Sequence, residues 1–118
     1  MLAYFLNFAN IFSMKINLFD SGVETFISSL EKLTVAKVLR TIDLLEIFGS
    51  SLGLPHSKKI KNKLYELRIR GKQEVRIFYT FYRDEAVLLH GFLKKSRQIP
   101  GKEIKIALQK LTILLVVR

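Results

Sequence analysis

Residues that could bind a phosphate and act on it are concentrated in residues 64–100. Arg68 and Arg76 alternate with apolar residues in two segments joined by a turn that begins at Gly71, and His90 comes shortly before a pair of lysines. Successive side chains of a strand point to opposite faces, so the pattern predicts a sheet with one apolar and one cationic face. A cationic face indicates a polyanionic partner. Histidine is a residue type commonly used for proton transfer, so His90 would allow such chemistry on that partner.

The cations are unevenly distributed. The 118-residue chain has a formal net charge of +10, but its first 57 residues hold four basic and five acidic side chains. Residues 58–76 hold eight basic against two acidic side chains, and residues 94–105 hold five against one. Such clustering is typical of a nucleic-acid footprint, whereas charge that only keeps a protein soluble is mixed in sign and dispersed. The predicted RNA-binding cations are Lys58, Lys59, Lys61, Lys63, Arg70, Lys72 and Arg97.

Length and composition exclude several classes of protein. The chain is long enough for one small core and too short for two domains. It has no cysteine, which excludes disulfides, thiol catalysis and Cys-ligated zinc, and is consistent with a cytoplasmic protein. It has two histidines and no glycine-rich loop before a helix, so we expect no metal, no cofactor and no small-molecule ligand.

Residues 1–13 are uncharged and rich in aromatic side chains. They are shorter than the roughly 20 apolar residues that span a bilayer, and they lack the basic start of a secretory signal. We therefore interpret them as an apolar extension that can be removed, with a single domain over residues 14–118 and no membrane association. The alternative is a weak anchor to a membrane or a partner.

The remaining pattern predicts an α+β fold. A strand begins at Met14, and two helices follow, the first with a capping box of Ser21 and Glu24, the second with Thr34 as N-cap and Gly53 at its end. We interpret residues 56–63 as a basic linker.

After that linker, residues 64–70 and 74–81 form an antiparallel hairpin with Arg68 opposite Arg76, and residues 86–92 form a central third strand. Pro100 marks the start of a last helix, and the chain beyond Thr112 is expected to be strand-like or disordered.

Three segments carry a resemblance to a known family: KLYELRIRGKQEVRIFYTF, VLLHGFLKK and the helix with a Pro-x-x-Glu-Ile start. With the helical segment DLLEIFGSSLGLP, they resemble the RelE/HigB superfamily of toxins, in its phage-derived HigB-like branch, over about residues 14–110. The resemblance implies a RelE-like fold, in which an N-terminal strand and a helical hairpin pack on a mostly antiparallel sheet followed by a C-terminal helix. It also implies a metal-independent endoribonuclease that cleaves mRNA on the ribosome, and a cognate helix-turn-helix antitoxin.

The resemblance assigns candidate catalytic residues. Arg76 corresponds to the arginine of the family's Y-R-[VIL]-x-Y pattern, and Arg68 matches the arginine of the preceding L-R pair. The full candidate set is Arg68, Arg76, His90, Lys94 and Lys95. The sequence departs from the family's best-studied members at Leu64 and Glu66, where those members have basic side chains, so the acid and the base stay unassigned.

Other interpretations remain open at this point. His90 could be a hydrogen-bonded core histidine, and Arg68 could pair with Glu66 or Glu74. The whole chain could be a non-catalytic RNA-binding module, or an inactive toxin remnant that only binds its antitoxin.

Overall fold

Five strands form where the sequence alternates or is continuously apolar. The computed structural model describes residues 13–117. The strands are β1 (Lys15–Leu18), β2 (Ser57–Lys61), β3 (Leu64–Ile69), β4 (Val75–Tyr82) and β5 (Glu85–Leu93). They lie in the order β1-β5-β4-β3-β2, with β1 parallel to β5 and every other pair antiparallel. The expected α+β class and mostly antiparallel sheet are therefore confirmed.

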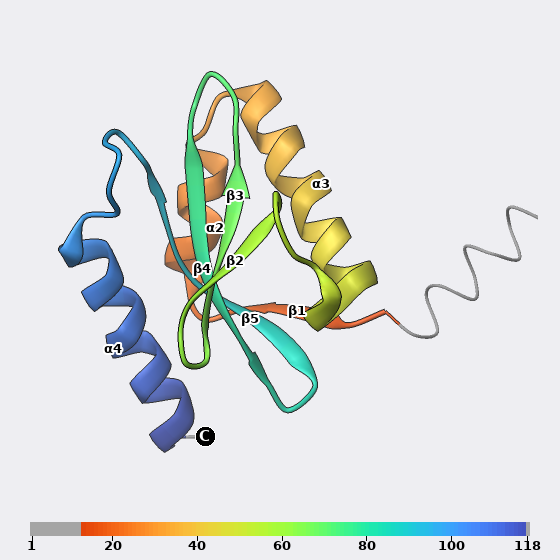
Figure 1. The fold of residues 1–118 in the computed structure, drawn as a ribbon, viewed down its shortest axis with the longest axis vertical. Coiled ribbons are helices and arrows are strands. Elements are labelled where there is room, and N and C mark those ends of the chain that lie inside the picture. Colours follow the sequence, from red (N-terminus) through yellow and green to blue (C-terminus); the bar gives the residue numbers. More distant parts are fainter. Residues whose placement is uncertain (1–12, 118) are drawn as a thin grey trace, which may run out of the picture.

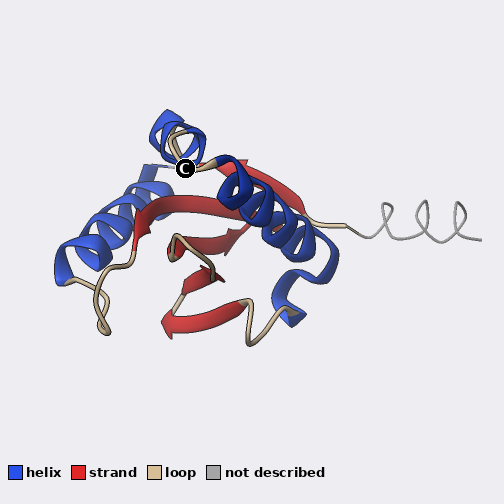
Figure 2. Ribbon diagram, turned by 90° about the horizontal axis from the view of Figure 1, so that it is seen from above, coloured by secondary structure: helices blue, strands red, loops and turns tan. Residues whose placement is uncertain are grey.

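Helices cover both faces of this twisted sheet (Figures 1 and 2). They are α2 (Ser21–Ser28), α3 (Lys32–Phe48), a short 3₁₀ turn η1 (Gly49–Ser51) and α4 (Gly101–Val117). Helices α2 and α3 pack on one face, where Val23, Val38 and Leu45 are buried with Leu67, Ile69, Val75, Ile77, Tyr79 and Leu88. Helix α4 packs on the other face, over Leu64, Phe78, Val87, Leu89 and Phe92.

The second core corrects the expectation of one wholly cationic face. Phe78 and Thr80 lie on the same face of β4 as Arg76, and both are buried. Ala107, Leu111 and Leu114 of α4 belong to the core that contains Phe78. Cationic side chains therefore occupy only the part of this face that α4 leaves uncovered.

The basic segment before the hairpin is not a linker. Residues 57–61 form β2, an edge strand antiparallel to β3 in which Lys58 lies opposite Glu66. The strand was not recognised in the sequence because three of its five residues are lysines and its register shifts between Lys59 and Lys61, so no regular alternation of apolar and polar residues is present. Lysine commonly protects an edge strand from further pairing.

The helix ends also differ from the expectations. Asp20, not Ser21, caps α2, and its carboxylate accepts a hydrogen bond from the backbone N–H of Gly22 at 3.0 Å. Helix α3 begins at Lys32 rather than after Thr34, and it ends at Gly49, whose φ of 54° is left-handed, rather than at Gly53.

The C-terminal segment continues as helix to Val117, against the expectation of strand or disorder beyond Thr112. Leu111 and Leu114, one helical turn apart, are buried on the sheet, whereas Ile113, Leu115 and Val116 are exposed. Residues 113–117 are all apolar, so no helical alternation of apolar and polar residues could be seen in this part of the sequence.

The third strand of the prediction is confirmed as β5, which is paired on both sides, although β4 is the middle strand of the five. Gly91 lets α2 approach β5 closely, because a Cβ atom there would lie 2.5 Å from the Phe26 ring. None of the helices described between residues 13 and 117 is both long and apolar enough to cross a membrane. The interpretation of residues 1–13 as an extension concerns a segment that, up to residue 12, lies outside the described residues.

Candidate nucleic-acid interface

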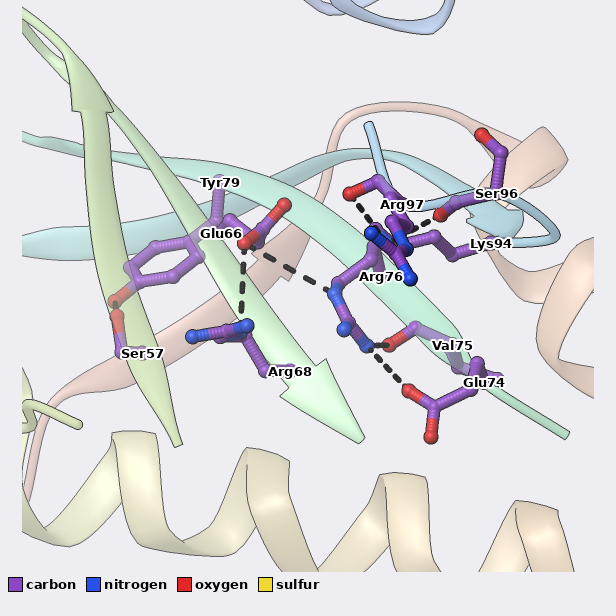
Figure 3. A network of polar contacts seen from close by, with 10 residues as sticks. All are labelled: Ser57, Glu66, Arg68, Glu74, Val75, Arg76, Tyr79, Lys94, Ser96 and Arg97. Atoms are coloured by element: carbon purple, nitrogen blue, oxygen red, sulfur yellow. Dashed lines mark hydrogen bonds and ion pairs between the residues drawn. The ribbon is translucent and has the colours of Figure 1, made fainter. Parts of the chain in front are cut away.

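A basic pocket lies where the ends of β3, β4 and β5 meet the loop that follows β5. Its volume is about 460 Å³. The lining residues are Arg68, Arg70, Glu74, Arg76, Lys94, Lys95, Ser96 and Arg97. Six of these eight side chains are cationic and one is acidic, so the pocket is suited to an anion. Figure 3 shows most of them from close by.

The strand register brings the two central arginines together. Arg68 on β3 lies directly opposite Arg76 on β4, as the hairpin pattern predicted. Side chains opposite each other in an antiparallel pair are neighbours, and like charges in this position repel. The side chain of Arg76 is only 3% exposed, whereas that of Arg68 is 21% exposed.

A buried glutamate lies between these arginines. Glu66 Oε1 is 3.7 Å from Arg68 Nε and 3.9 Å from Arg76 Nε (Figure 3). Both distances are ion-pair distances but too long for hydrogen bonds. Within the described part of the chain, Glu66 Oε2 and the two Nε atoms are buried without a hydrogen-bond partner.

Burial raises the pKa of Glu66, although the charges of Arg76, Arg68, Lys58 and Lys94 act to lower it. The desolvation of this carboxylate therefore outweighs the attraction of the cations around it.

Two contacts fix the outer part of the pocket. Arg76 Nη1 donates to Glu74 Oε2 at 3.1 Å and to the Val75 carbonyl oxygen at 3.0 Å. Lys94 Nζ donates to the carbonyl oxygens of Ser96 and Arg97, at 2.5 Å and 3.0 Å. The Lys94 ammonium thus folds the loop back on itself beside Arg76, and it leaves Lys95 and Arg97 exposed at the rim.

The structure does not bring His90 into this pocket. His90 Nε2 lies 2.8 Å from Glu103 Oε1 in the first turn of α4, and both side chains are largely buried. On β5, Phe92 stands between His90 and Lys94 on the same face, stacked on Phe78 with ring centroids 5.6 Å apart. This position agrees with the alternative of a hydrogen-bonded histidine better than with contact to a phosphate in the pocket.

Some of the remaining predicted RNA-binding residues line the pocket, and others lie elsewhere on the surface. Arg70 and Arg97 line the pocket. Lys72 lies in the β3–β4 turn, where its ammonium is 4.0 Å from Glu31. The lysines of β2 and its turn, Lys58, Lys59, Lys61 and Lys63, are exposed at the edge of the sheet and do not line the pocket.

Two acidic residues belong to this site that the sequence suggested only as ion-pair partners of Arg68, not as site residues. Glu74 lines the pocket, and Glu66 lies beneath it. Glu66 is two residues from Arg68, and Glu74 is two residues from Arg76, so each carboxylate was expected on the same strand face as its arginine. This spacing could have identified both as site residues. Within residues 13–117, no three His, Cys, Asp or Glu side chains are grouped closely enough to hold a metal ion.

The fold and the pocket define a RelE-like α+β protein with a cationic site at one end of its sheet. The chain belongs to the family described as phage-derived Gp49-like proteins (DUF891), whose model matches residues 25–112. This is a family of RelE/YoeB-type toxins, so the resemblance seen in the sequence is confirmed.

Among solved structures, the fold is similar to a chain of the YoeB–YefM complex from Staphylococcus aureus. The match has a TM-score of 0.51 and 19% sequence identity, and covers 70% of this chain and 97% of that chain. At this identity the similarity concerns the fold. None of the curated proteins matches the chain.

Proposed function

We propose that this protein is the toxin of a type II toxin–antitoxin system, an mRNA endoribonuclease that acts on the ribosome and inhibits translation. The observation that carries the proposal is the pocket in which Arg68 and Arg76, neighbours across the β3–β4 hairpin, lie together with the basic loop after β5. Membership of a family of RelE/YoeB-type toxins supports it.

Cleavage of RNA through its own 2′-hydroxyl makes three demands. A base takes the proton of the 2′-OH, cations stabilise the charge on the phosphorane, and a proton or positive charge reaches the leaving 5′-oxygen. The pocket offers cations of two kinds for a phosphate. Arg68 and Arg76 have planar guanidinium groups suited to binding two oxygens at once, and Lys95 is a compact point charge.

We assign the phosphate-binding roles to Arg76 and Arg68. Lys94 holds the loop through its two carbonyl contacts, so that Lys95 and Arg97 close the pocket over the bound strand. Glu74 is the one carboxylate among the lining residues, which makes it our candidate for the base. His90, whose ring is bonded to Glu103, has in this proposal the role of holding α4 against β5.

The proposal includes a partner and a place of action. A cognate helix-turn-helix antitoxin would bind and silence the toxin, and the toxin would act on ribosome-bound mRNA in the cytoplasm. No metal ion or cofactor takes part in the proposed reaction.

The test is to induce the chain in growing bacteria, with and without the neighbouring open reading frame, and to map cleaved message on ribosomes. We use Arg76→Lys because Arg76→Ala would remove one of the two cations beside the buried Glu66, and removing a partner of a buried ion pair typically costs about 3–5 kcal/mol. Arg76→Lys keeps the charge but loses the planar fork. It is expected to lower the cleavage rate about a hundredfold or more while the protein stays folded.

Lys105→Gln is the matched control, since this exposed lysine lies on α4 and does not line the pocket. It should cleave like the unchanged chain. Ribosome binding without cleaved message would favour a non-catalytic RNA-binding module. Antitoxin binding without translation arrest would identify an inactive remnant, and either result would refute the proposed enzyme.

A further inference from the structure

A second basic pocket lies between α3 and the end of β3. Its volume is about 420 Å³. The charged or titratable residues that line it are Lys37, Arg40, His56, Arg68 and Arg70. The other lining residues carry no charge, so the described residues that line this pocket include no acidic side chain.

The pocket exists because β2 is shorter than β3. Strand β2 begins at Ser57, opposite Leu67, so the end of β3 has no strand on the side away from β4. There the backbone N–H of Arg68 donates to the His56 carbonyl oxygen at 2.9 Å, the last contact before the chains separate. The edge of β3 is thus left open toward α3.

The two basic pockets are neighbours that share part of their lining. Arg68 and Arg70 line both of them. A single strip of cations therefore runs from Lys37 and Arg40 on α3, across the end of β3, to Arg76 and the loop after β5. We call this the cationic strip.

The cations at the α3 end of the strip have no ion-pair partner in the described part of the chain. Other lysines are paired, such as Lys110 with Asp20 at 2.9 Å and Lys72 with Glu31 at 4.0 Å. By contrast, Lys37, Arg40 and Arg70 form no ion pair with any residue between 13 and 117. Lys37 Nζ extends over the β3–β4 turn, where a Cβ atom on Gly71 would lie 2.6 Å from it.

We propose that Lys37, Arg40 and His56 form a second phosphate-binding subsite, which holds the RNA strand next to the nucleotides bound at Arg76. This inference rests on the proposed function, because the strand that enters the Arg76 pocket is the one that continues along the strip. A polymer with a phosphate at every residue can occupy both pockets through the shared arginines, which a single small anion cannot.

We expect the subsite to bind mainly the RNA backbone. None of its described lining residues is Phe, Tyr or Trp, and its charged side chains are all cations, which suit phosphate oxygens. Contacts of cations with phosphate oxygens position a strand without reading its sequence. The subsite is therefore expected to raise the affinity for RNA and to fix the direction in which the RNA strand crosses the protein, without selecting its sequence.

The probe is RNA with 2′-O-methyl groups throughout, which has no nucleophile and stays intact. Binding to the purified full chain is measured at two salt concentrations, with oligonucleotides of about three and about ten nucleotides. For the variant Lys37→Gln/Arg40→Gln, affinity for the longer RNA is expected to fall about tenfold, and its salt slope to become shallower by about 1.4, or about 0.7 per lost contact. Affinity for the shorter RNA should not change, because that RNA fills only the Arg76 pocket.

The control variant is Lys15→Gln/Lys105→Gln, which removes the same charge from two exposed positions on β1 and α4. An equal loss in the control, or an equal loss for both RNA lengths, would overturn the subsite. So would competition by polyglutamate as effective as that of RNA, since the strip would then fit an acidic protein. If the double variant folds poorly, each single variant should still lower the slope by about 0.7.

The inference and the proposed function fail in different experiments. Cleavage that survives Arg76→Lys removes the enzyme but leaves the strip as an RNA-binding surface. Unchanged binding in Lys37→Gln/Arg40→Gln, with Arg76→Lys inactive, removes the subsite alone.

Discussion

At the scale of single residues, the site is dominated by the balance between Glu66 and the two arginines beside it. Without Glu66, Arg68 and Arg76 would repel each other across the hairpin. With it, a carboxylate is buried at 3% exposure with one oxygen unpaired. Ion pairs in such a position often contribute little net stability, because desolvation offsets the attraction.

The raised pKa of Glu66 shows that burial outweighs the ion pairs, and this has a measurable consequence for stability. Because burial raises the pKa, the folded protein holds this proton more tightly than the unfolded chain does. The stability that Glu66 contributes is complete below the usual glutamate pKa, and it is lost as the pH rises through the raised value.

Glu66→Gln should therefore gain stability relative to the unchanged protein as the pH rises from about 4 to about 7. Denaturant unfolding at both pH values measures the difference. Asp43→Asn, which removes a carboxylate from an exposed position on α3, is the matched control. If Glu66→Gln instead becomes less stable as the pH rises, the ion pairs outweigh burial and our reading of the site is wrong.

At the scale of elements, the sequence predicted those parts whose periodicity is visible. The β3–β4 hairpin, the β5 strand and the start of α4 follow the expected alternation or capping residues. Strand β2 was missed because it is mostly lysine and lacks a regular alternation of apolar and polar residues. The end of α4 was missed because residues 113–117 are all apolar. The burial of these elements depends on what they pack against, and a single sequence does not contain that information.

The end of α4 supplies a prediction about packing. Leu114 is 3% exposed against the core around Phe78, whereas its neighbour Leu115 is 40% exposed. Leu114→Ala is expected to lower the free energy of unfolding by about 2 kcal/mol, through lost burial and the cavity left behind. For a domain of this size that corresponds to a melting temperature lower by roughly 8 °C.

Leu115→Ala makes the same chemical change on the exposed side of the helix. It should alter the free energy of unfolding by less than about 0.5 kcal/mol. Thermal melts of the two variants provide the comparison. Equal effects would mean that the last turns of α4 do not pack on the sheet in solution.

At the scale of the whole molecule, the site is assembled from segments that are far apart in sequence. The hairpin contributes Arg68 and Arg76, the loop after β5 contributes Lys94 to Arg97, and α3 contributes Lys37 and Arg40. The pairing within the hairpin could be predicted, since it depends on local register. The pocket between α3 and the end of β3 could not be predicted, because it depends on where β2 begins along the other edge of β3.

The lysines at the other edge of the sheet lead to a prediction about the whole charged surface. Lys58, Lys59, Lys61 and Lys63 lie on β2 and the turn that follows it, outside both basic pockets. Phosphate contacts release counterions from RNA, so each contact adds to the salt dependence of binding. If these lysines contact ribosomal RNA or message, replacing all four with Gln should weaken ribosome binding and make its salt slope shallower by about 3.

If only the net charge of the protein mattered, removing a lysine would weaken ribosome binding less, and by the same amount at any position on the surface. The variant Lys15→Gln/Lys105→Gln separates the two explanations, because it removes positive charge from β1 and α4. Ribosome binding is measured by co-sedimentation at two salt concentrations. If the β2 lysines contact phosphates, the loss of affinity per removed charge should be clearly larger in the β2 variant than in the control. The reason is that counterions are released only where a cation neutralises a phosphate. Unchanged affinity and slope in the β2 variant would show that this edge of the sheet faces solvent when the protein is bound.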